Sequence, residues 1–205
     1  MRMLRRNALS FLTCMPIAAA AGGASVATAA VPEEKPKTSG KILFVVTSHG
    51  ELGNTGRKTG YWLSEVTHPW KVLKDAGYEI DFVSPLGGEC PSEGIDASDP
   101  INKEFSQDLS AQKKINFTMK PSDVKPDEYK AIFFAGGHGV MWDFPDNKEL
   151  AAITSKIYEN GGVVAAVCHG PAGLVNVKLS NGKYLVEGKM INSFTNSEEK
   201  GIGLD

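Results

Sequence analysis

The sequence predicts an α/β fold of three layers, in which helices cover both faces of a mostly parallel sheet with flavodoxin-like topology. Two observations predict this class. Short, β-branched apolar runs, which suit strands buried on both faces, alternate with segments of helical periodicity. One such run, residues 163–167, leads to Cys168 between Ala166 and Gly170, the small-x-nucleophile-x-small pattern of a nucleophile elbow between strand and helix.

The N-terminal part of the chain is predicted to lie outside this domain. Residues 1–29 combine early arginines, a mostly apolar stretch and an A-x-A cleavage motif, which together indicate a signal peptide. The arginine pair at residues 5–6 leaves both the general secretory and the twin-arginine route open, and either would export the protein, to the periplasm. Residues 30–40, rich in proline and charge, are expected to form a disordered tether, and residues 41–205 one domain.

Within the domain, predicted strands and helices follow one another in order. Strands are expected at residues 41–48, 79–84, 129–135, 163–167 and 189–195. Helices are expected at residues 69–76, 147–159 and from about Pro171 onward. Pro69 is expected in a first helical turn, and Gly77 at that helix's C-terminal end. Residues 85–125 are expected to form a long functional loop with one short helix near residues 102–109.

The composition excludes several classes of function. The net charge of −2, with no basic block outside the leader, gives nucleic-acid binding no electrostatic support. The glycine-rich residues 49–60 contain neither G-x-G-x-x-G nor a Walker motif, so no phosphate site is expected. His49 and His68 form no zinc-type cluster with cysteines or carboxylates, and we expect no metal and no cofactor. After leader cleavage no membrane contact is expected, and Cys90 and Cys168 are expected to stay reduced.

Three loops are expected to meet where the parallel strands end, at residues 49–65, 136–139 and 168–169. Cys168 precedes a predicted helix and is adjacent to His169, so its thiol pKa is expected below the ~8.5 of free cysteine. Thiolate attack on a carbonyl creates an oxyanion, which backbone N–H groups stabilise best. Gly136, Gly137 and the His169 amide can supply such donors.

Several motifs resemble the ThiJ/PfpI superfamily, which shares the class I glutamine-amidotransferase-like fold, over residues 41–205. The markers are Ala-Val-Cys-His-Gly-Pro at 166–171, Ala-Gly-Gly-His-Gly at 135–139, and Glu65 with His68-Pro69. Three further segments resemble one branch of this superfamily, the glyoxalase III and heat-shock chaperone branch. They are residues 143–145, residues 158–162, and residues 191–195 before Glu198-Glu199. A glutaminase of this fold needs a later His-x-Glu pair; the sequence has none, so glutamine hydrolysis is not expected.

The resemblance implies a role for each candidate residue. Cys168 resembles the nucleophile, His169 resembles its partner, and Glu199 resembles the acid that orients His169, with Glu198 as a rival. Glu65 resembles the acid that moves protons. The backbone amides of Gly137 and His169 would form the oxyanion hole, and Gly136 and His138 would line the pocket. The implied reaction converts methylglyoxal, a 2-oxoaldehyde, to lactate through a Cys168 hemithioacetal without glutathione. A holdase chaperone for unfolded or glycated proteins, and a cysteine peptidase or protein deglycase using the same residues, remain alternatives.

Sequences that this chain resembles continue with a further helix and closing strands, so C-terminal elements of the fold are expected to be missing. The sheet is then expected to expose an edge that favours association into a homodimer. Ile191 and Phe194 are expected to be unusually exposed, and the domain to be marginally stable.

Overall fold

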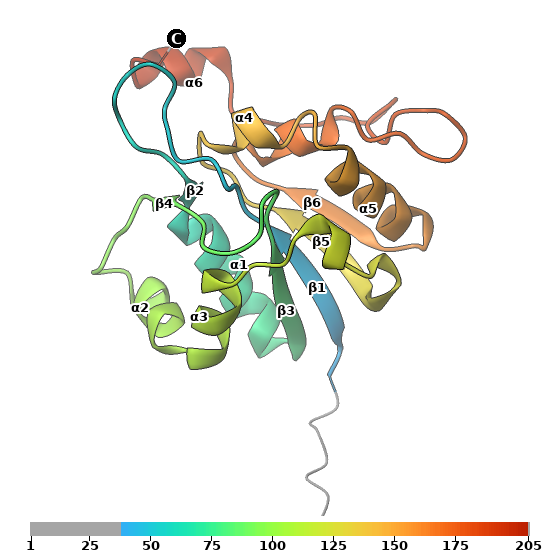
Figure 1. Ribbon diagram of the computed structural model, residues 1–205, viewed down its shortest axis with the longest axis horizontal. Coiled ribbons are helices and arrows are strands. Elements are labelled where there is room, and N and C mark those ends of the chain that lie inside the picture. The colour runs from blue at the N-terminus through green and yellow to red at the C-terminus, as the bar shows by residue number, and fades with distance from the viewer. Residues whose placement is uncertain (1–37, 205) are drawn as a thin grey trace, which may run out of the picture. The chain divides into compact units, whose positions relative to one another are not determined.

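The structure, a computed structural model, describes residues 38–204; the predicted signal peptide and the tether up to residue 37 lie outside the described residues. A parallel sheet has the strand order β3-β1-β5-β6, as Figure 1 shows. Its strands are β1 Gly40–Val45, β3 Tyr78–Val83, β5 Tyr129–Phe134 and β6 Val163–Ala166. The predicted α/β class and four of the five predicted strands are therefore confirmed.

Helices cover both faces of the sheet (Figure 1). Alternate residues of β1 point in opposite directions, as the two-residue repeat of a strand requires. Ile42 and Phe44 belong to one core cluster, with side chains of α1 Leu63–Asp75, α2 Pro100–Gln107 and α3 Leu109–Asn116. Leu43 and Val45 belong to the other, with side chains of α5 Lys148–Glu159. Within the described residues, no helix is long and apolar enough to span a bilayer.

Helix α1 corrects the prediction for Pro69. The helix begins six residues before this proline, which therefore lies in its interior rather than in its first turn. A proline there costs the helix one hydrogen bond, but burial of Val66, Thr67 and Trp70 against the sheet offsets the loss. Gly77 ends the helix as predicted, with a φ of 84° that favours glycine.

The region predicted as one long loop, residues 85–125, contains much more regular structure. Helices α2 and α3 follow one another there, each with an aspartate N-cap: Asp99 accepts from two backbone amides of α2, and Asp108 accepts from the Ala111 amide of α3. Phe105 and Ile115 are buried in the core. Helix α2 confirms the short helix predicted near residues 102–109, whereas α3 was not predicted, because a helix of only eight residues is too short for a clear periodic pattern.

The C-terminal part departs furthest from the prediction. Residues 189–195 form no strand and pair with none of the described strands. Met190 is fully exposed there and Ile191 half-exposed, so this stretch buries too little apolar surface to replace a strand of the sheet. Strand β6 is consequently an edge strand with Val163 62 % exposed, instead of being buried on both faces.

Two short strands and two short helices complete the described elements and adjoin the ends of the large strands. Strands β2 Tyr61–Trp62 and β4 Ser92–Glu93 form a parallel pair that the sequence did not predict. Helix α4 Val140–Asp143 follows the loop after β5, and α6 Asn196–Gly201 is the last helix (Figure 1). Three 3₁₀ turns lie at Pro121–Asp123, Pro126–Glu128 and Gly170–Leu174.

Candidate active site

The predicted site lies where the parallel strands end. Val45 pairs in register with Phe134, and Phe134 pairs with Ala166, so β1, β5 and β6 end at the same edge of the sheet. The residues that follow these strands, 135–138 and 167–169 among them, therefore meet there, as expected for an open α/β sheet.

Cys168 occupies a strained turn directly after β6. Its φ of 55° makes it the only non-glycine residue with positive φ among those described. A Cβ on Gly170 would collide with the Phe134 carbonyl, which explains why a small residue flanks the nucleophile. The turn continues as the 3₁₀ turn Gly170–Leu174, not as the predicted α-helix. The aligned peptide dipoles of a long helix are therefore not available to lower the thiol pKa.

A hydrogen-bonded chain runs from Cys168 through His169 to Glu199. Cys168 Sγ lies 3.3 Å from His169 Nδ1, and His169 Nε2 lies 2.6 Å from Glu199 Oε1. The imidazole is buried, and the ring of Phe194 stacks on it with centroids 4.5 Å apart. This is the arrangement of a nucleophile, a base and an acid that orients the base.

Of the two adjacent candidates Glu198 and Glu199, only Glu199 forms a hydrogen bond with His169. Glu198 forms a capping box at the start of α6, in which its carboxylate accepts from the backbone amide and hydroxyl of Thr195. Glu199, one residue on, accepts from His169 and His138 instead. Burial works against ionisation of Glu199, but these hydrogen bonds outweigh it and lower the pKa of its carboxyl. Glu199 is therefore a carboxylate at neutral pH.

Glu65 projects from the first turn of α1 toward Cys168. Its Oε2 accepts from the Gly136 amide at 2.8 Å, and burial raises the pKa of the Glu65 carboxyl. Burial and then the nearby Glu65 charge raise the pKa of the Cys168 thiol to about 11. The predicted low thiol pKa is thus wrong, because a buried neighbouring carboxylate disfavours a second negative charge. A thiol of this kind needs a base when it attacks, and His169 Nδ1 is in contact with it.

Two backbone amides converge on the Cys168 sulfur. Hydrogen bonds from the backbone amides of Gly137 and His169 favour the thiolate, so they offset part of the rise in the Cys168 pKa that burial causes. Gly137 has a φ of 98°, and a Cβ there would collide with the Gly60 carbonyl, so glycine is required at this position. Donors beside the sulfur can also reach an oxygen on the carbon that the sulfur attacks, which is the geometry of an oxyanion hole.

His138 makes more contacts than a pocket-wall residue needs. Its Nε2 lies 3.2 Å from Glu199 Oε2, and its ring centroid lies 4.4 Å from that of His169. Glu93 accepts from the His138 amide at 3.1 Å and lies 3.8 Å from its Nδ1. Sequence reasoning missed Glu93 and Phe194. No local pattern marks them, since Glu93 approaches the site through the pairing of β4 with β2.

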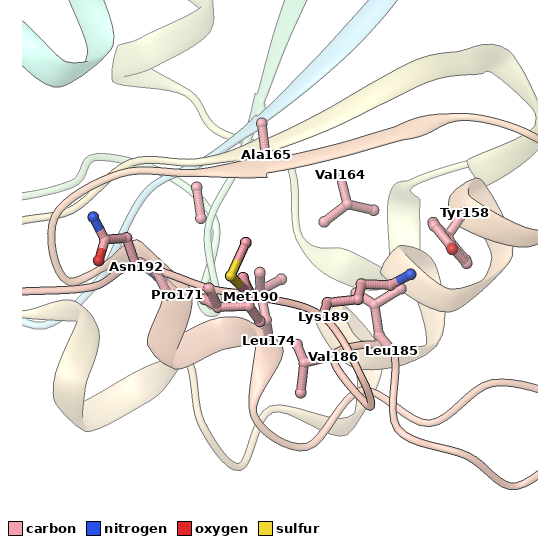
Figure 2. A pocket seen from close by; sticks show the side chains of 12 residues that line it. Tyr158, Val164, Ala165, Pro171, Leu174, Leu185, Val186, Lys189, Met190 and Asn192 are labelled. Carbon is pink, nitrogen blue, oxygen red and sulfur yellow. The ribbon is translucent and has the colours of Figure 1, made fainter.

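Two cavities lie near this end of β6. One, of about 430 Å³, is lined by His169 and Glu199 together with apolar side chains such as Met141, Ile191 and Phe194. Figure 2 shows the other, of about 420 Å³, which lies against β6 and is bordered by the loop that contains Lys189 and Met190. None of the predicted catalytic side chains lines this second cavity.

Comparisons with known proteins agree with this arrangement. The model of the DJ-1/PfpI family matches residues 58–198. The glutathione-independent glyoxalase HSP31 of Saccharomyces cerevisiae is 39 % identical over 174 residues, covering 80 % of this chain and 73 % of that protein. Glyoxalase 3 of Candida albicans is 36 % identical over 177 residues, covering 80 % and 72 % of the two chains.

Solved structures show the same similarity. The 24 kDa rapid encystment protein of Francisella tularensis has a TM-score of 0.76 at 42 % identity, covering 80 % of this chain and 74 % of that one. The crystal structure of glyoxalase III from Candida albicans has a TM-score of 0.73 at 33 % identity, covering 80 % and 72 %.

Proposed function

Because this chain belongs to the DJ-1/PfpI family, we propose that it is a glutathione-independent glyoxalase, which converts methylglyoxal to lactate. The observation that supports this best is the chain from Cys168 through His169 to Glu199, with Glu65 adjacent. A soft nucleophile, a base in contact with it and amides facing the developing oxyanion are the groups that addition to an aldehyde requires.

The proposed reaction begins when His169 Nδ1 takes the Cys168 proton and the sulfur bonds to the aldehyde carbon of methylglyoxal. The aldehyde oxygen becomes an oxyanion facing the Gly137 and His169 amides, and protonation gives a hemithioacetal. Glu65 or His169 then moves the proton from this carbon to its neighbour through an enediol, which leaves a thioester. Water cleaves the thioester, so that methylglyoxal plus water gives lactate and regenerates the thiol. The balance needs neither an oxidant nor glutathione.

The direct test is lactate formation from methylglyoxal in buffer free of thiols. The purified wild-type chain is expected to form lactate at a rate proportional to enzyme concentration, measured with a lactate dehydrogenase assay. Absence of lactate above the uncatalysed rate, from a protein that melts cooperatively, would refute the proposed activity.

Glu65→Gln is expected to lower kcat by about 100-fold, the scale of a lost general acid–base. The same change removes the carboxylate charge that raises the pKa of Cys168, so this pKa should fall below about 11. Iodoacetamide should therefore alkylate Cys168 faster at neutral pH in the variant although turnover falls. The exposed Glu51, changed to Gln, is the matched control and should alter neither rate. An unchanged alkylation profile in Glu65→Gln would show that Glu65 does not act on the thiol.

A second candidate function, a holdase-type chaperone, is supported by exposed apolar side chains in the region 85–125. Leu86, Ile95, Leu109 and Phe117 are each at least 70 % exposed, and such surface can bind unfolded chains. A Leu109→Ser, Phe117→Ser double variant should lose most of its ability to suppress aggregation of a heated client protein, measured by light scattering, while it retains lactate formation. Suppression equal to wild type would count against this second function.

A further inference from the structure

Three side chains with metal-ligating atoms converge on the Glu199 carboxylate. His138 follows β5, His169 follows β6, and Glu199 lies on α6, so three separate segments bring them together. One ligand atom from each lies within 4.8 Å of the others. His169 Nε2 and His138 Nε2 contact different oxygens of the same carboxylate, at 2.6 and 3.2 Å.

We propose that His138, His169 and Glu199 form a reversible binding site for Zn²⁺ or a similar transition-metal dication, and that occupancy inhibits the enzyme. Imidazole nitrogen and carboxylate oxygen bind zinc at ~2.0–2.2 Å, and a site with three protein ligands leaves one position for water. An ion centred between three atoms that lie at most 4.8 Å apart is at most about 2.8 Å from each of them, so shifts of less than 1 Å bring all three ligands within bonding distance. Small side-chain rotations therefore complete the site. The binding is independent of the proposed glyoxalase activity, and only the inhibition rests on it.

The surroundings of the two histidines also suit a metal. Histidines that bind zinc usually pair their other ring nitrogen with a carboxylate or another acceptor. His138 Nδ1 lies 3.8 Å from Glu93, and His169 Nδ1 lies 3.3 Å from the Cys168 sulfur. Phe194 stacks on His169 and excludes water from that face of the imidazole. The cavity of about 430 Å³ lined by His169 and Glu199 offers both an access path and space for a metal-bound water.

Zinc is expected to inhibit the enzyme because it binds the atoms that hold the base His169 in place. The ionised Glu199 accepts hydrogen bonds from both Nε2 atoms, and zinc would replace the bond that orients His169 and stabilises its protonated form. The Cys168 sulfur contacts the opposite ring nitrogen, Nδ1, and so is not a ligand. Zinc is therefore expected to stop turnover without covering the thiol.

The test titrates metal-free full-length protein with zinc sulfate by calorimetry. One zinc per chain is expected. His138→Gln should weaken binding by more than the ~10- to 100-fold that losing an outer partner costs. His68→Gln is the matched control: His68 pairs with Asp99 at the surface, and its loss should leave binding unchanged. Cys168→Ser should also bind zinc as tightly as wild type, and zinc-loaded wild-type protein should still be alkylated by iodoacetamide at Cys168.

Several results would overturn the site. These are equal zinc affinity in His138→Gln and wild type, loss of binding in His68→Gln or Cys168→Ser, or protection of Cys168 from alkylation by zinc. Zinc that binds as expected but leaves lactate formation unchanged would overturn the inhibition. If the wild type forms no lactate at all, the proposed glyoxalase function fails, while the calorimetry still decides whether the metal site exists.

Discussion

Cys168→Ala is expected to lower kcat for methylglyoxal by on the order of 10⁴-fold or more, because no other group in the site can form the covalent adduct. Alanine keeps the Cβ of Cys168, which packs closely against Gly136, and removes only the sulfur. Residual activity should therefore report lost chemistry rather than a collapsed site. Lactate formation and the melting temperature, measured on the same preparation, check both points.

Cys90→Ala is the control for this result. Cys90 is half-buried, and its sulfur contacts the Gly88 carbonyl and the Thr118 hydroxyl rather than any imidazole. Burial raises the pKa of the Cys90 thiol as it does that of Cys168, but Cys90 lacks the adjacent imidazole that would take its proton. The Cys90 variant should keep near wild-type turnover. If turnover survived in Cys168→Ala and disappeared in Cys90→Ala, Cys90 and not Cys168 would be the nucleophile.

Glu199→Gln is expected to produce the second largest loss, about 10²- to 10⁴-fold in kcat, as when the acid of a catalytic triad is neutralised. Glutamine can replace the shape of the carboxylate, but it cannot stabilise a protonated His169 or accept hydrogen bonds from both histidines with full charge. The loss should appear in kcat far more than in KM, measured by initial rates of lactate formation.

The neighbouring Glu198→Gln separates catalysis from helix capping. Glu198 holds Thr195 at the start of α6 and makes no hydrogen bond to His169, so its loss should lower local stability only slightly. Turnover should fall only a few-fold, and the melting temperature should change little. If Glu198→Gln were as inactive as Glu199→Gln, the orientation of α6 rather than the Glu199 charge would be what the site needs.

The sequence by itself determined the fold class and which loops meet around Cys168. The apolar run before Cys168 and the small residues around it predicted an elbow on a parallel sheet, and the structure has one, with Cys168 at a φ of 55°. Strand ends and glycine-rich loops predicted that Gly136 and Gly137 lie beside Cys168, because parallel strands align their carboxyl ends. These features are local or follow from sheet geometry, so residue patterns suffice to predict them.

Only the tertiary structure decided which of the two adjacent glutamates contacts His169, and how readily the Cys168 thiol ionises. Glu198 and Glu199 are adjacent and chemically identical, and only the capping box at Thr195 turns Glu199 toward His169. The thiol pKa depends on burial and on the Glu65 charge, which α1 brings from about 100 residues away. The contact of His138 with Glu199 likewise joins segments that are distant in sequence. Electrostatic energies depend on distances and solvent exposure in space, and spacing along the chain does not contain them.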